Sequence, residues 1–281
     1  MDDIAIAVRG LHKKYKDTLA VSGLDLEVRR GEVFSLLGPN GAGKTTTVEI
    51  LEGYRARDSG DVTVLGVDPG RPPTGWRSRI GIVLQSVNDA AELTVAEMVS
   101  HFACFYPDPR SPDEVIDLVG LGAKRKARTR QLSGGQRRRL DVALGILGRP
   151  ELLFLDEPTT GFDPQARRQF WSLIRQLNDE NTTIVLTTHY LEEAEALADR
   201  VAVVSAGRIL AVGPPSHLGD RDTAMTTVTW GGPNGAESVR TNTPTQVVTE
   251  LARRFDGEIP GLAVRRPTLE DVYLSMIGAA R

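Results

Sequence analysis

The chain has 281 residues, which favours one principal domain with a small appendage over two large domains. Lysine and arginine number 34 against 37 for aspartate and glutamate, so the formal net charge is −3 and nucleic acid is not expected as a main partner. Cys104 is the only cysteine, which excludes an intrachain disulfide, and no apolar run approaches the ~20 residues that span a bilayer.

The first part of the chain reads mainly as strands. Residues 1–4 lack the basic start and apolar core of a secretory signal. Residues 4–8 and 24–28 alternate apolar and polar side chains, which predicts an antiparallel sheet of half-buried strands near the N-terminus. Residues 33–37 are almost continuously apolar, which predicts a central strand buried on both faces. We expect a helix at residues 44–51 and further strands at 62–65 and 80–84.

A mostly helical stretch runs from Thr94 to about Gly148. Thr94 with Glu97 has the spacing of a capping box, and Pro107 and Pro109 mark a break between helices. Cys104 follows apolar residues in this stretch, so we expect an unreactive core thiol. Strands then alternate with helices, which predicts an α/β fold with a mainly parallel sheet. The strands are expected at 152–155, 184–186 and 201–204, and the helices at 165–177 and 191–197.

Gly213-Pro214-Pro215 marks a change in composition toward Thr, Gly and Asn. Beyond it we expect strands at 225–230 and 262–264 and helices at 244–255 and 268–276. The predicted domains are therefore residues 1–218, with a helical subdomain at about 88–148, and residues 219–281 as a small α/β appendage.

Residues 38–45, Gly-Pro-Asn-Gly-Ala-Gly-Lys-Thr, fit the phosphate-loop pattern G-x-x-x-x-G-K-[ST] between a buried strand and a helix. Glycines let backbone N–H groups face phosphate oxygens, and the helix N-terminus adds positive charge. Lys44 is expected to reach the β- and γ-phosphates and Thr45 to ligate Mg²⁺. The alternative is an ordinary glycine turn with a surface lysine.

Two acids end the strand expected at residues 152–155. At the carboxyl edge of a parallel sheet, where ligands bind, Asp156 is expected to hold Mg²⁺ directly or through water. Glu157 is expected to polarise the attacking water because a carboxylate accepts the proton that develops on it. The alternative is a pair of solvated acids that cap a turn before Pro158.

Residues 132–136 read Leu-Ser-Gly-Gly-Gln between these two motifs. With this pentapeptide the chain resembles the ATP-binding subunits of ABC transporters over about residues 4–215. The resemblance implies a P-loop NTPase fold with an N-terminal antiparallel β subdomain and an inserted helical subdomain, binding ATP and Mg²⁺. It also implies a homodimer, because in that family Ser133 and its neighbours face the γ-phosphate held by the other subunit.

Four further residues match the family's motifs. Tyr15 stands where an aromatic ring stacks on adenine, although simple surface packing is the alternative. Gln85 ends a strand as the Q-loop glutamine does, contacting Mg²⁺ and sensing the membrane partner. Asp163 lies in a D-loop in which Phe162 replaces the more frequent leucine. His189 follows a strand as the switch histidine does and is expected to bridge the γ-phosphate and Glu157.

The site residues implied by the resemblance fall into three groups. The catalytic residues are Glu157, His189, Lys44 and Gln85. The magnesium ligands are Thr45, Gln85 and Asp156. The ATP-binding residues are Tyr15, Gly38, Pro39, Asn40, Gly41, Ala42, Gly43, Lys44, Thr45, Thr46, Gln85, Ser133, Gly134, Gly135, Gln136, Asp163 and His189.

A basic cluster comprises residues 124–126, Arg128 and residues 137–139. Nucleic-acid binding is one interpretation. We favour a solvated helix face with some stems packed on apolar neighbours, because the overall charge is acidic and aromatic residues are not interleaved.

Residues 61–66, 92–95 and 267–273 resemble the bacterial drug-exporter (ABC-2) subgroup, such as the daunorubicin-resistance ATPases, although Tyr273 stands where Phe is commoner. This implies a subunit that is soluble by itself, peripheral on the cytoplasmic face of the membrane, and powers export through a separate permease. Contact with the permease is expected around Gln85 and residues 88–110, and the C-terminal segment is expected to serve assembly or stability. The alternative is a soluble regulatory ATPase that acts on nucleic acid or a protein complex. The transported compound is not identified, because specificity resides mainly in the permease.

Overall fold

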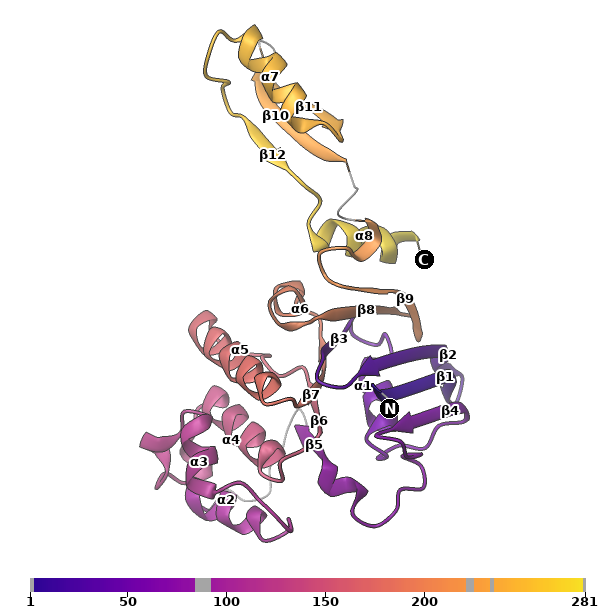
Figure 1. Ribbon diagram of the computed structural model, residues 1–281, viewed down its shortest axis with the longest axis vertical. Coiled ribbons are helices and arrows are strands. Elements are labelled where there is room, and N and C mark those ends of the chain that lie inside the picture. The colour runs from indigo at the N-terminus through magenta and orange to yellow at the C-terminus, as the bar shows by residue number, and fades with distance from the viewer. Residues whose placement is uncertain (1–2, 84–91, 221–224, 233–234, 280–281) are drawn as a thin grey trace. The chain divides into compact units, whose positions relative to one another are not determined.

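The computed structural model describes residues 3–83, 92–220, 225–232 and 235–279. The chain forms two compact units, residues 1–212 and 213–281, and each is described here by itself (Figure 1). The domain boundary predicted between residues 218 and 219 falls inside the second unit.

An antiparallel sheet begins the first unit, as predicted. β1 (Ile4–Tyr15) lies between β2 (Thr18–Arg29) and β4 (Ser59–Val64). β1 and β2 are longer than expected because the pairing continues to Tyr15 and Thr18 across several register shifts. Lys16, with φ of 50°, makes the tight connection between the two strands.

The central sheet has the strand order β5-β6-β7-β3-β8-β9. The five strands β5 (Ile80–Val83), β6 (Leu152–Asp156), β7 (Thr183–Thr188), β3 (Val33–Leu37) and β8 (Arg200–Ser205) pair in parallel. This confirms the predicted α/β fold. β9 (Arg208–Gly213) was not predicted; it follows β8 through Ala206 and Gly207, which both have positive φ.

Side chains of the central strands alternate between two apolar cores. In β6, Leu152 and Phe154 pack with the antiparallel sheet, whereas Leu153 and Leu155 pack with the helical part of the unit. All five residues of β3 are buried, as expected for a strand covered on both faces. The strands that carry the predicted site are therefore packed on both faces of the sheet.

Three helices form the helical part: α2 (Val95–Ala103), α3 (Pro112–Leu118) and α4 (Gly134–Ile146) (Figure 1). The capping box of Thr94 and Glu97 is present. Cys104 is exposed at the end of α2, so the predicted core thiol is wrong; the buried positions of this helix lie on another of its faces. Two short 3-10 turns, η2 (Gly122–Lys124) and η3 (Thr129–Gln131), lie between α3 and α4. A third, η1 (Trp76–Arg79), directly precedes β5. The other helices of this unit are α1 (Lys44–Leu51), α5 (Pro164–Asp179) and α6 (Leu191–Leu197).

The second unit contains a three-stranded sheet in the order β11-β10-β12. Its strands are β10 (Thr226–Gly232), β11 (Gly235–Thr241) and β12 (Ala263–Arg265). α7 (Pro244–Arg254) supplies Leu251 to a small core with Val228 and Ile259. η4 (Leu218–Asp220) and α8 (Leu269–Ala279) complete the unit. Across the described parts of both units, every helix is too short or too polar to cross a lipid bilayer.

Candidate functional site

The phosphate loop leads from β3 into α1, as predicted. Gly43 precedes the helix with φ of 100°, and a Cβ there would lie 2.3 Å from the Ala20 carbonyl oxygen, so only glycine fits. Lys44 Nζ donates hydrogen bonds to the carbonyl oxygens of Gly38 at 2.7 Å and Pro39 at 3.2 Å. Burial lowers the pKa of Lys44, while the carboxylates of Glu157 and Asp156 oppose that shift. The amine is therefore held inside the loop rather than in solvent.

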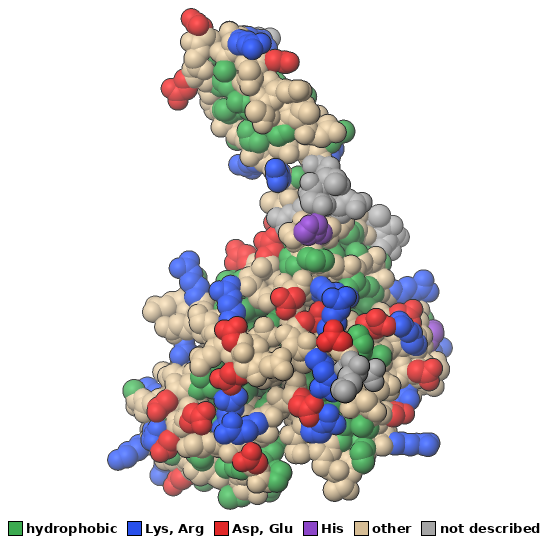
Figure 2. Space-filling model, in the orientation of Figure 1, with side chains coloured by type: hydrophobic (Ala, Val, Ile, Leu, Met, Phe, Trp, Pro, Cys, Tyr) green, Lys and Arg blue, Asp and Glu red, His purple; other side chains and the backbone are tan. Residues whose placement is uncertain are grey.

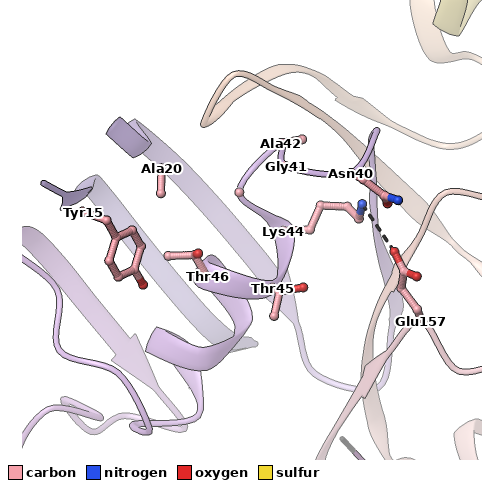
Figure 3. A pocket seen from close by; sticks show the side chains of 10 residues that line it. Tyr15, Ala20, Asn40, Gly41, Ala42, Lys44, Thr45, Thr46 and Glu157 are labelled. Carbon is pink, nitrogen blue, oxygen red and sulfur yellow. Dashed lines mark ion pairs between the residues drawn. The ribbon is translucent and has the colours of Figure 1, made fainter. Parts of the chain in front are cut away.

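A pocket of about 460 Å³ opens over this loop (Figure 3). It brings together the predicted residues Tyr15 and 40–46 with Glu157, and Ala20 also lines it. The Tyr15 ring lies at the far side of the loop from Glu157, with the Arg55 guanidinium 5.2 Å from its centroid. The pocket thus has an aromatic end, a glycine-rich floor and an acidic end.

Asp156 is connected to the phosphate loop by Thr45. The Thr45 hydroxyl lies 3.3 Å from both carboxylate oxygens of Asp156, which also accepts a hydrogen bond from the Thr187 hydroxyl. A hydroxyl and a carboxylate beside a phosphate site are the oxygen ligands that suit Mg²⁺. Nearby Glu52 adds little negative charge, because burial and the carboxylates of Asp156 and Glu49 raise the pKa of Glu52 to about 8.

Glu157 lies next to two other predicted catalytic residues, Lys44 and His189. Its Oε1 is 3.7 Å from Lys44 Nζ, the ion pair drawn in Figure 3, and 3.3 Å from His189 Nδ1. Its backbone has φ of 44°, a conformation that costs about 1–3 kcal/mol for a residue other than glycine. The Glu157 N–H donates to the carbonyl and hydroxyl oxygens of Thr187, which helps to maintain this conformation. The carboxylate is thereby aimed at the phosphate loop.

The Leu-Ser-Gly-Gly-Gln segment forms the start of α4. Ser133 is its N-cap, with Oγ accepting from the Gln136 N–H at 3.3 Å. A second pocket, of about 490 Å³, lies here and is lined by Ser133, Gly134, Gly135, Gln136 and Asp163 among others. Among the residues that the structure describes, the linings of the two pockets have no member in common. The fold does not bring the predicted residues Ser133–Gln136 and Asp163 to the phosphate loop of the same chain.

Gln85 lies outside the described residues, and its roles stay predictions. Phe162 packs edge-on against Phe170, with ring centroids 5.8 Å apart, in line with a local packing change. Asp163 caps α5 by accepting a hydrogen bond from the Ala166 N–H at 2.8 Å.

The basic cluster is only partly a solvated face. Arg125 pairs with Asp113 at 2.6 Å and Arg128 with Glu92 at 2.5 Å, and Figure 2 shows acidic and basic side chains interspersed over the visible face of the larger unit. Arg138 departs from the prediction because it is buried and donates to backbone carbonyl oxygens. A run of three arginines does not indicate which of them is buried. The sequence likewise does not predict the hydrogen bond from Thr187 to Asp156.

Comparisons with known proteins fit this geometry. The family described as "ABC transporter" matches residues 21–160. The chain is 38% identical to the daunorubicin resistance ATP-binding protein DrrA3 of Streptomyces coeruleorubidus, covering 100% of this chain and 98% of that protein. It is also 38% identical to the Nod factor export ATP-binding protein I of Rhizobium sp. (strain N33), covering 99% and 98%. A dimeric ATP-binding cassette in a post-hydrolysis state with ADP and Pi shares the fold, with a TM-score of 0.68 and 24% identity, over 74% of this chain and 98% of that one.

Proposed function

This chain belongs to the family of ABC transporter ATP-binding proteins and is an ATPase, and from that premise we propose that two copies close around two ATP molecules. Each ATP lies between the phosphate loop of one copy and Ser133–Gln136 of the other. The observation that supports this arrangement is the separation of the two pockets in one chain, each of which has only part of the expected ATP contacts. A dimeric solved structure with the same fold is consistent with it.

In this proposal the phosphate-loop residues hold the triphosphate and Tyr15 stacks on adenine. Bound Mg²⁺, held by Thr45, Asp156 and Gln85, would neutralise charge on the β- and γ-phosphates. The proximity of Glu157 to Lys44 and His189 supports a role in orienting the attacking water and accepting its proton. His189 bridges Glu157 and the γ-phosphate. Little covalent chemistry is needed, because phosphoryl transfer depends on positioning and charge stabilisation.

We also propose that the chain powers export through a separate membrane permease, from the cytoplasmic face of the membrane. The support is the similarity, along almost the whole chain, to proteins named for daunorubicin resistance and Nod factor export. A drug or another lipophilic compound is the cargo class that this similarity favours. Closure of the dimer would pull on the permease through the region of Gln85 and residues 88–110, and residues 219–281 would serve assembly or stability.

Lys44→Ala is expected to weaken ATP binding about 10- to 100-fold, because it removes a charge-assisted contact to the phosphates. Titration with a fluorescent ATP analogue measures the affinity. Lys126→Ala, at an exposed lysine away from both pockets, is the matched control and should bind as the parent does. Parent-like affinity for a folded Lys44→Ala chain would reject the assigned nucleotide site.

The transport proposal is tested by coexpression with the candidate permease and membrane fractionation. The chain is expected in the membrane fraction only when the permease is present, and the complex should hydrolyse ATP. Recovery of the chain entirely in the soluble fraction, bound to nucleic acid or to another protein complex, would support the regulatory alternative instead.

A further inference from the structure

Arg138 connects α4 to the turn that carries Glu157. It lies in the second turn of α4 and is 8% exposed. Its Nε donates to the Pro158 carbonyl oxygen at 3.1 Å, and a terminal nitrogen donates to the Asp156 carbonyl oxygen at 2.6 Å. Burial lowers the pKa of Arg138, and the carboxylates of Asp141, Asp156 and Glu193 oppose that shift.

The two accepting carbonyl groups lie on either side of Glu157 in the chain. Because Glu157 has φ of 44°, its flanking peptide groups must be held against relaxation to an ordinary conformation. Thr187 accepts a hydrogen bond from the N–H of Glu157. Arg138 donates hydrogen bonds to the carbonyl oxygens of the preceding residue, Asp156, and the following residue, Pro158. A planar guanidinium can reach both carbonyl oxygens at once, which the single ammonium of lysine does less well.

The same helix begins at Ser133, which lines the second pocket. We propose that Arg138 is a positioning residue. It fixes the turn at residues 156–158, which carries Glu157, and couples this turn to α4. When Ser133 contacts the ATP bound to the phosphate loop of the partner, a movement of α4 would then change the position of Glu157 at the ATP bound to its own phosphate loop. This inference rests on the proposed shared-site dimer and adds a route within each chain between the two ATP molecules.

Arg138→Met is expected to lower kcat about 10- to 100-fold, with KM for ATP within about twofold of the parent, because Glu157 is misplaced while the phosphate contacts remain. Arg138→Lys should recover part of the loss. Arg137→Met is the matched control, since Arg137 lies on the same helix but donates to the Thr129 carbonyl oxygen, and it should keep the parent kcat. A folded Arg138→Met chain with parent kcat overturns the proposal, as does a change confined to KM. If Arg138→Met does not fold, Arg138→Lys decides by the same criterion.

Hydrogen exchange tests the positioning role without hydrolysis. In the full chain without nucleotide, the peptide covering residues 156–161 is expected to exchange at least threefold faster in Arg138→Met than in the parent and in Arg137→Met. Equal exchange overturns the positioning role, whether or not the chain dimerises.

The coupling is tested with Mg-ATP in the Glu157→Gln background. Dimer closure is expected to protect residues 156–161, and the further change Arg138→Met should remove this protection while the dimer persists. Equal protection in a persistent dimer overturns the coupling. Failure of Glu157→Gln to dimerise would instead refute the proposed function, which separates the two conclusions.

Discussion

Glu157→Gln is expected to bind ATP as the parent does and to lose turnover about 100- to 10,000-fold, the range that a positioned general base contributes. Glutamine keeps the shape of the side chain but cannot accept the proton of the attacking water. The Lys44 and phosphate-loop contacts remain, so ATP binding should persist and ATP-bound dimers should accumulate. Phosphate release at saturating Mg-ATP measures turnover, and size exclusion with ATP measures the dimer.

Glu27→Gln is the control for this variant, because Glu27 is an exposed acid on β2 outside the pocket lining. It should hydrolyse ATP at the parent rate. If Glu157→Gln also did so, the role assigned to Glu157 would be wrong, and another group would have to activate the water.

Ser133→Arg is expected to abolish hydrolysis, with at least a 100-fold loss, while ATP binding to the single chain stays nearly intact. Ser133 is exposed in the second pocket, so a large side chain there would block the approach of the partner's triphosphate. The phosphate loop lies in a different pocket and should be unaffected. Phosphate release and titration with a fluorescent ATP analogue measure the two effects separately.

Loss of the N-cap of α4 costs about 1 kcal/mol, so the melting temperature of Ser133→Arg must be compared with that of the parent. Ser172→Arg, an exposed position on α5, controls for the added charge and bulk. Loss of ATP binding together with hydrolysis in a folded Ser133→Arg chain would argue against a shared site.

The parts of the fold that sequence predicted best have strong local signals. The nearly continuous apolar residues of β3 and β6 predict burial on both faces, and the phosphate-loop pattern that includes Gly43 and Lys44 predicts a strand–loop–helix context. The family resemblance of the ordered motifs is confirmed by full-length relatives. The roles of Lys44, Glu157, His189 and Gln85 stay predictions that the variants above address.

The features that sequence missed depend on the tertiary fold. β9 and β11 lie at the edges of their sheets. β11 has few apolar residues, so its composition resembles that of a loop. β9 does contain an apolar run, residues 209–212, but its pairing beside β8 is fixed by the tertiary fold. Cys104 is exposed because α2 packs through another of its faces. Apolar neighbours in the sequence do not determine which face of a helix is buried. The positive φ of Glu157 and the hydrogen bonds from Arg138 to the carbonyl oxygens of Asp156 and Pro158 depend on residues of different elements, and no local sequence pattern marks them.

The dependence of turnover on protein concentration, followed together with sedimentation velocity in Mg-ATP, tests the shared site most directly. We predict that turnover per chain rises with concentration in proportion to the dimer fraction and approaches zero where only monomer sediments. Constant turnover per chain, in samples that sediment only as monomer throughout, would contradict the account.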